Sequence, residues 1–161
     1  MPLSARLPTV AQLRHVLEES LGRDVALRSS APALVGASTT SLGVYVGERL
    51  ATRGIVVAEL GAVAVLGAAQ ARVPPLVAAE AIKSRFVPPP VSDGFGALLL
   101  ALGELFDPAD SPPGRLYTYL RPGQDRPPDV LAAASRIGRR LDVTVVPSGY
   151  ASGRLSLVPV S

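Results

Sequence analysis

The residues able to carry out chemistry are few, and the clearest group lies near the start of the chain. His15 is the only histidine, and Glu18 and Glu19 follow it about one helical turn later. A histidine with two carboxylates can bind a metal ion or transfer protons. However, adjacent helical residues point in different directions, and the chain has no second histidine and no cysteine. We therefore interpret this group as a solvated helix surface and predict no metal site and no cofactor.

The other acidic candidates are isolated carboxylates. Glu59 lies in an apolar run at an expected strand-to-helix junction, where the helix dipole favours an acidic residue. A partly buried functional carboxylate is the alternative interpretation of Glu59. Glu80 and Glu104 each lie on an expected helix and have ordinary solvated interpretations. No GxSxG segment accompanies His15, so no serine hydrolase site is predicted.

Three glycines invite comparison with phosphate-binding loops. Gly36, Gly43 and Gly47 fit neither GxxxxGK[ST] nor GxGxxG, and the sole lysine, Lys83, lies inside an expected helix. We interpret these glycines as strand and turn positions and predict no nucleotide binding.

The composition indicates one apolar, globular domain. The chain has 161 residues, of which 48% are hydrophobic and 18% charged, and this length can bury a sizeable core. It has no cysteine, which excludes disulfides, thiolate metal sites and a cysteine nucleophile. We therefore expect residues 1–161 to form a single domain.

The charge pattern argues against nucleic-acid binding. The net charge of +3 is small for such a protein, and the basic residues are scattered. The densest cluster is Arg136, Arg139 and Arg140, whose spacing places them on one face of an expected helix. They could meet a phosphate or an acidic partner, but we interpret them as a solvated face near a helix C-terminus.

A membrane span is not expected. The most apolar segment, Ile55 to Ala69, is shorter than the roughly 20 residues that cross a bilayer, and it contains Glu59. The first 20 residues lack the apolar region of a signal peptide. We expect a cytoplasmic protein.

The first helix has recognisable start and stop signals. Thr9 and Gln12 have the types and spacing of a capping box, and Gly22 is a natural end. Between them, apolar residues recur on one helical face: Val10, Leu13, Leu17 and Leu21.

Strands are predicted where β-branched and alternating residues gather. In chain order they cover residues 24–29, 42–48, 53–58, 115–120, 142–147 and 154–160, with a further short strand considered at 33–37. Short links join the second strand to the third and the fifth to the sixth, which favours antiparallel hairpins. Pro159 predicts that the last strand lies at a sheet edge.

Four more helices are predicted from Ala-rich, proline-bounded segments. They cover residues 59–72, 76–86, 94–106 and 128–141. Pro75 suits the first position of its helix, and residues 87–91 (VPPPV) are expected to form a stiff connector. The order is α-β-β-β-α-α-α-β-α-β-β, which predicts an α+β fold with a largely antiparallel sheet and Ala-rich helices on one face.

The middle of the chain resembles a known family. Residues 59–86 read ELGAVAVLGAAQARVPPLVAAEAIKSRF, residues 93–107 read DGFGALLLALGELFD, and LGVYVGE precedes them at 42–48. Over roughly residues 42–120 these segments are similar to the CheC/CheX-type chemotaxis phosphatase superfamily, in particular to its CheX-like branch. The resemblance implies a CheX-like fold.

The resemblance also implies a chemistry, which the sequence lacks. In that superfamily a helix carries Glu-x-x-Asn, and the Asn amide orients a water that attacks a phosphorylated receiver domain. This chain has no asparagine, and it reads Asp93-Gly94-Phe95-Gly96-Ala97 where the motif is expected. Gln70 or Gln12 could replace the amide, with Glu59 or Glu104 as the carboxylate.

We therefore predict a non-catalytic, partner-binding or regulatory domain in two-component or chemotaxis-type signalling, with a protein partner such as a receiver domain. The alternative is a phospho-aspartate phosphatase in which Gln replaces Asn. A small-molecule sensor is a third hypothesis. A homodimer is expected through one of two helix surfaces rich in small residues, listed in chain order: Gly61, Ala64 and Ala68, or Ala97, Leu100 and Ala101.

Overall fold

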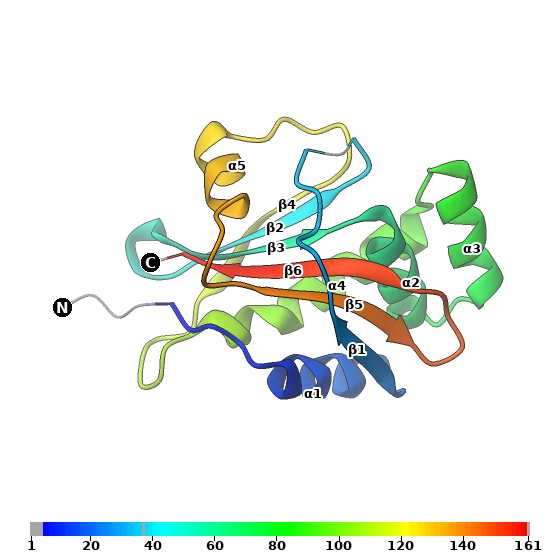
Figure 1. The fold of residues 1–161 in the computed structure, drawn as a ribbon, viewed down its shortest axis with the longest axis horizontal. Helices are drawn as coiled ribbons and strands as arrows, with labels where there is room; N and C mark the ends of the chain where they lie inside the picture. The colour runs from blue at the N-terminus through cyan, green and yellow to red at the C-terminus, as the bar shows by residue number, and fades with distance from the viewer. Residues whose placement is uncertain (1–4, 37, 161) are drawn as a thin grey trace.

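The protein is built around a six-stranded sheet, which Figure 1 shows edge-on between its helices. The computed structural model describes residues 5–36 and 38–160. In this part of the chain the strands are β1 (Val25–Ser29), β2 (Ser41–Val46), β3 (Thr52–Ala58), β4 (Arg115–Leu120), β5 (Leu141–Pro147) and β6 (Gly153–Pro159). They lie in the order β1-β5-β6-β3-β2-β4, and every neighbouring pair is antiparallel.

The helices follow the predicted order. The α-helices are α1 (Val10–Leu21), α2 (Leu60–Ala71), α3 (Pro75–Ser84), α4 (Pro89–Leu102) and α5 (Pro128–Ala134), with short 3₁₀ helices η1 (Glu48–Leu50) and η2 (Gly103–Phe106). The α+β class and the antiparallel sheet are therefore confirmed.

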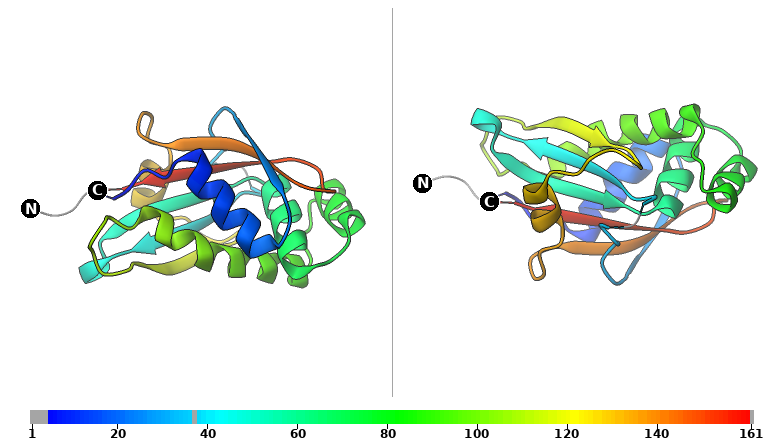
Figure 2. Two further views of the ribbon diagram at one scale, coloured as in Figure 1. Left: turned by 90° about the horizontal axis from the view of Figure 1, so that it is seen from below. Right: turned by 90° about the horizontal axis from the view of Figure 1, so that it is seen from above.

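The sheet is covered on both faces, which corrects the prediction of helices on one face only. In β3, Val56 and Ala58 belong to the larger core, whereas Ile55 and Val57 belong to a smaller core with α5. This division follows from the alternation of side chains along a strand. Figure 2 shows α1 and α4 over one face and α5 over the other.

Local signals decide where the helices begin. In α1 the Thr9 side chain accepts from the Gln12 backbone N–H at 3.1 Å, and the Gln12 side chain accepts from the Thr9 N–H at 2.9 Å, so the capping box is confirmed. Helix α4 begins at Pro89, five residues before its predicted start at residue 94. Residues 89–91 of the expected connector are thus helical, because the first turn of a helix tolerates prolines that lack an N–H.

Two other boundaries differ from the predictions. Residues 33–36 form no strand, and residue 37 lies outside the described residues. Helix α5 ends at Ala134, whereas residues 128–141 were predicted to be helical. Gly138 has a φ of 105°, a backbone conformation that an α-helix cannot include.

Strand β6 is central, so the edge predicted from Pro159 is wrong. The Val160 N–H donates to the Arg53 carbonyl of β3 at 2.9 Å, and the nitrogen of the preceding Pro159 therefore faces the other neighbour, β5. On that side the pairing stops where Leu141 meets Leu157. The missing N–H of the proline therefore costs no ladder hydrogen bond.

Among the described residues, no single helix is long and apolar enough to cross a membrane. One bent pair, Pro75–Ser84 with Pro89–Phe106, meets the length and composition criteria, and its two parts are inclined by 103°.

Helices α2 and α4 cross with their backbones in contact. A Cβ at Gly67 of α2 would lie 2.2 Å from the Val91 carbonyl oxygen, and one at Gly94 of α4 would lie 2.3 Å from the Gly67 carbonyl oxygen. Neither position can hold a larger residue without separating the helices, because the obstructing atoms belong to the backbone. This contact brings the middle of α4 onto α2, every residue of which from 62 to 69 is buried.

The crossing gives a test with a matched control in the same helix. We expect Gly94→Ala to lower the free energy of unfolding by about 1–3 kcal/mol, because the helices must move apart. At Gly96, two positions away, an added Cβ meets only the Tyr119 ring at 3.3 Å, and alanine favours the helix. Gly96→Ala should therefore cost much less in urea denaturation. Equal stability of Gly94→Ala and the natural protein would contradict the backbone crossing.

Candidate functional site

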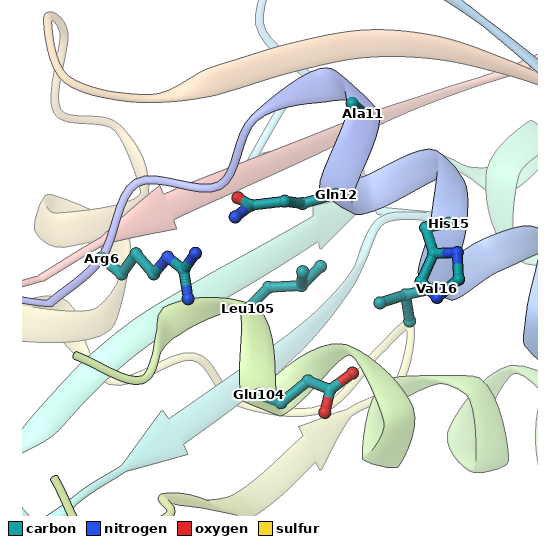
Figure 3. Close-up of a pocket in the computed structure, with 7 residues that line it drawn as sticks. All are labelled: Arg6, Ala11, Gln12, His15, Val16, Glu104 and Leu105. Atoms are coloured by element: carbon teal, nitrogen blue, oxygen red, sulfur yellow. The ribbon is translucent and has the colours of Figure 1, made fainter. Parts of the chain in front are cut away.

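A groove lies between α1 and η2, with a volume of about 400 Å³. We call it the α1–η2 groove; it is lined by Arg6, Ala11, Gln12, His15, Val16, Glu104 and Leu105. Figure 3 shows Leu105 between two polar ends, with Val16 beside His15. The head groups of Arg6 and Gln12 lie at one end, and the Glu104 carboxylate and His15 lie at the other.

Backbone contacts hold the two sides of the groove together. The Arg6 N–H donates to the Phe106 carbonyl at 3.0 Å, which fixes the segment before α1 against η2. Val16 and Leu105 are buried, whereas Arg6 and Glu104 are exposed. The groove therefore has an apolar base and charged rims.

The structure brings together two of the residues proposed for a phosphatase site, Gln12 and Glu104. The oxygen of Gln12 already accepts from the Thr9 N–H, which leaves its NH₂ group as a donor. Glu104 lies in the first turn of η2 and, among the described residues, takes part in no ion pair within 4.0 Å. The groove thus offers a carboxylate and an amide donor.

The other pair of candidates, Glu59 and Gln70, is engaged elsewhere. Glu59 precedes α2 without a capping hydrogen bond from its side chain; it accepts from the Leu34 N–H at 2.9 Å and pairs with Arg154 at 3.4 Å. Gln70, at the far end of α2, accepts from the Ser20 hydroxyl at 2.7 Å. Both side chains therefore have structural contacts, and they do not form one site.

The histidine and its acidic neighbours separate into two unrelated contacts. His15 Nε2 lies 3.1 Å from Glu19 Oε2, and both side chains are more than 70% exposed. Glu18 instead accepts from the Val25 N–H at 3.0 Å and so connects α1 to β1. Among residues 5–36 and 38–160, no three His, Asp or Glu side chains are arranged to hold a metal ion.

The predicted basic helix face does not exist, because α5 ends before the arginines. The Arg140 side chain is 5% exposed, pairs with Asp142 at 2.9 Å and donates to the carbonyls of Ala134 and Arg136. Arg139 donates to the Ala5 carbonyl at 2.6 Å. Arg140 and Arg139 thus have structural contacts that helical spacing could not reveal.

A second, apolar groove lies along α3, at the end of the molecule where Figure 1 places that helix. We call it the α3 groove; it is lined by Leu76, Val77, Glu80, Ala81, Ser84, Phe86 and Pro88, and its volume is about 320 Å³. Leu76 is 71% exposed and Phe86 is 66% exposed. This groove was not predicted from the sequence; the available signal was a large apolar residue directly beside each proline segment, Leu76 after Pro75 and Phe86 before residues 87–91.

The two helix surfaces predicted for a homodimer differ in their exposure. Ala64 and Ala68 are fully buried against the core, so the surface that includes them cannot meet a second chain. Ala97 and Leu100 of α4 are exposed, and Leu100 is 68% accessible. A homodimer stays a prediction for the α4 surface.

Comparisons with known proteins identify the fold. The sequence matches no protein-family description, and no curated protein is similar to it. Three solved structures are similar in fold: the FliM middle domain from H. pylori, the one from V. alginolyticus, and FliM from a FliM–SpeE complex of H. pylori. In that order the TM-scores are 0.52, 0.51 and 0.56, and the identities are 8%, 11% and 8%. The matches cover 92%, 91% and 91% of this chain and 83%, 86% and 79% of the others.

The chain therefore has the fold of the FliM middle domain, which belongs to the CheC/FliM/CheX-like chemotaxis fold family. The resemblance drawn from the sequence is confirmed at the level of the fold. At these identities the likeness carries no activity or partner across to this chain.

Gln12 and Glu104, which line the α1–η2 groove, should contribute differently to the stability of the protein. We expect Gln12→Ala to lower the free energy of unfolding by about 1 kcal/mol, because the capping box loses one of its two hydrogen bonds. Glu104→Gln should change the free energy of unfolding by less than about 0.5 kcal/mol, since that exposed side chain takes part in no ion pair among the described residues. Urea denaturation of both variants tests this, and a reversed order of stability would contradict the assigned roles.

Proposed function

We propose that this chain is a single-domain, cytoplasmic, non-catalytic module that binds a protein partner in signalling. The observation that carries this proposal is the α3 groove, with Leu76 and Phe86 exposed beside it. Large apolar side chains grouped at a surface groove are typical of protein-binding sites.

The α3 groove has enough unburied apolar surface to support binding. Covering a side chain of the size of Leu or Phe is worth about 1.5–3 kcal/mol. The base of the groove is preformed, because Ala81 and the neighbouring Ala78 are buried against the core. A partner would therefore gain apolar burial without first reorganising α3.

The charges around the α3 groove favour an acidic partner. Arg72, Lys83 and Arg85 are exposed on or next to α3 and lie outside the lining of the groove, whereas Glu80, the one acidic residue of this helix, lines it. The basic residues near the groove therefore outnumber the single acidic one. An amphipathic helix with apolar residues along one side and carboxylates beside them would complement both features. We therefore propose such a helix of a protein partner as the occupant.

The comparisons support a binding role without naming the partner. One of the similar structures is FliM of H. pylori in a complex with SpeE. That complex concerns FliM and not the present chain. A receiver domain is the partner that the family resemblance implies for this chain.

The second candidate function is phospho-aspartate phosphatase, favoured by the shared position of Gln12 and Glu104 in one groove. Phosphoryl transfer needs an attacking water held in line by fixed groups. The Gln12 oxygen is committed to the capping box, and only its NH₂ group remains to contact a water. We therefore infer that the protein is not catalytic.

Partner binding can be tested with two synthetic helical peptides that share one leucine stripe. One carries glutamates on its polar face and the other carries lysines. We expect fluorescence anisotropy to show tighter binding of the acidic peptide. The double variant Leu76→Ser, Phe86→Ser should weaken that binding at least about tenfold, because two apolar anchors are lost.

Ile137→Ser is the matched control, since Ile137 is 85% exposed and lies outside both grooves. It should bind the acidic peptide like the natural protein. Equal binding of both peptides, or no binding of either, would refute the proposed partner. If the protein instead binds anionic lipid vesicles, and this binding requires Leu76 and Phe86, the partner of the α3 groove is a membrane and not a protein.

The absence of catalysis is tested separately with a phosphorylated receiver domain. We expect its dephosphorylation rate to be the same with and without this protein, because the chain has no asparagine for a Glu-x-x-Asn motif and the Gln12 side chain is held in the capping box. An acceleration that both Gln12→Ala and Glu104→Gln abolish would instead establish the second candidate. Arg14→Gln, a change on the same helix outside the α1–η2 groove, serves as the control.

A further inference from the structure

The α1–η2 groove holds two opposite charges that do not neutralise each other. Arg6 and Glu104 both line it, and neither takes part in an ion pair within 4.0 Å among residues 5–36 and 38–160. His15, at the Glu104 end, is instead paired with Glu19. The groove therefore keeps one cation and one anion available to a ligand.

The donors and the acceptor are separated along the groove. Figure 3 shows the Arg6 guanidinium and the Gln12 head group at one end and the Glu104 carboxylate at the other. Because the Gln12 oxygen is bound to the Thr9 N–H, its NH₂ group adds a second donor at the Arg6 end. An anionic group fits at that end, and a cationic group fits beside Glu104.

The surface between the two ends is apolar. Val16 and Leu105 are 8% and 6% exposed and form the base of the groove. Its volume of about 400 Å³ lies within the range of small-molecule sites, roughly 300–1,000 Å³. An apolar base between a few polar groups is the usual composition of such sites.

From this arrangement we propose that the α1–η2 groove binds a small zwitterion whose carboxylate and ammonium group are separated by an apolar chain, such as an ω-amino acid. Its carboxylate is bound by Arg6 and the Gln12 amide, and its ammonium group by Glu104. Its apolar body covers Val16 and Leu105. This inference goes beyond the proposed partner binding, because it concerns a different surface and a different class of ligand.

The test is a titration of the ¹⁵N-labelled full chain with leucine and with 6-aminohexanoate, which differ in the separation of their charges. We expect saturable shifts of the Gln12 side-chain amide with 6-aminohexanoate, and weaker binding of leucine, whose two charges lie on one carbon. 6-Acetamidohexanoate lacks the ammonium group and 6-aminohexanamide lacks the carboxylate. Each should bind at least about tenfold more weakly than 6-aminohexanoate, since each loses one charge-assisted contact.

Variants locate the binding to this groove. Arg6→Gln and Glu104→Gln should each weaken the zwitterion about tenfold. Arg14→Gln on α1 and Glu80→Gln on α3 are the matched charge controls and should leave it unchanged. The double variant Leu76→Ser, Phe86→Ser should also bind the zwitterion normally, so failure of the partner proposal is distinguishable from failure of this one.

Three outcomes would overturn the proposal. The first is the absence of saturable binding of 6-aminohexanoate up to about 10 mM, a concentration far above the dissociation constants of typical ligands. The second is equal binding of the blocked derivatives, which would show that the charged ends are not recognised. The third is unchanged binding by Arg6→Gln and Glu104→Gln, which would place the ligand elsewhere.

Discussion

The helical layer depends on the close backbone contact between α2 and α4. Gly67 and Gly94 have no side chain, so each helix meets a carbonyl oxygen of the other. The Tyr45 hydroxyl of β2 donates to the Leu99 carbonyl of α4 at 2.6 Å, which ties the same helix to the sheet, and burial raises the pKa of this phenol well above its usual range. Because α4 is fixed at this crossing, η2 at its end and α3 before it have defined positions, and both grooves are built on them.

The opposite face of the sheet is held by a polar network instead of a large core. The Asp142 carboxylate accepts from the Arg140 guanidinium at 2.9 Å and from the Ser156 hydroxyl at 2.6 Å, and the Ser156 hydroxyl in turn accepts from the Ala33 N–H at 2.9 Å. Since Arg140 also donates to the carbonyl of Ala134, the last residue of α5, these contacts join the end of α5 to β5 and β6. Buried charges are tolerated here because they are paired and hydrogen-bonded. Arg139 and Arg140, which resemble part of a functional basic cluster in the sequence, thus make contacts that stabilise the fold.

The fold of the FliM middle domain is compatible with several functions, because a scaffold does not specify the chemistry placed on it. In this chain most carboxylates and amides with catalytic potential are occupied: Glu18 by a strand N–H, Glu59 by a loop N–H, and Gln70 by Ser20. Two surfaces of different character remain available among the described residues. The α3 groove presents apolar side chains with Glu80 at its lining and basic residues nearby, and the α1–η2 groove presents opposite charges around an apolar base. This difference is the physical reason for assigning them to different classes of ligand.

The sequence by itself determined the element order, the antiparallel hairpins and the start of α1, because these follow from local periodicity, turn length and the Thr9–Gln12 capping box. It also excluded thiol chemistry and the Asn-dependent phosphatase motif by composition alone. Only the tertiary structure showed that Pro159 is tolerated in a central strand, since this depends on the strand order and on where the neighbouring strand stops. Likewise, no local pattern joins Arg6 or Gln12 to Glu104, which are about 90 or more positions apart in the chain. They line one groove only because α1 packs against α4 and the segment before α1 is hydrogen-bonded to η2.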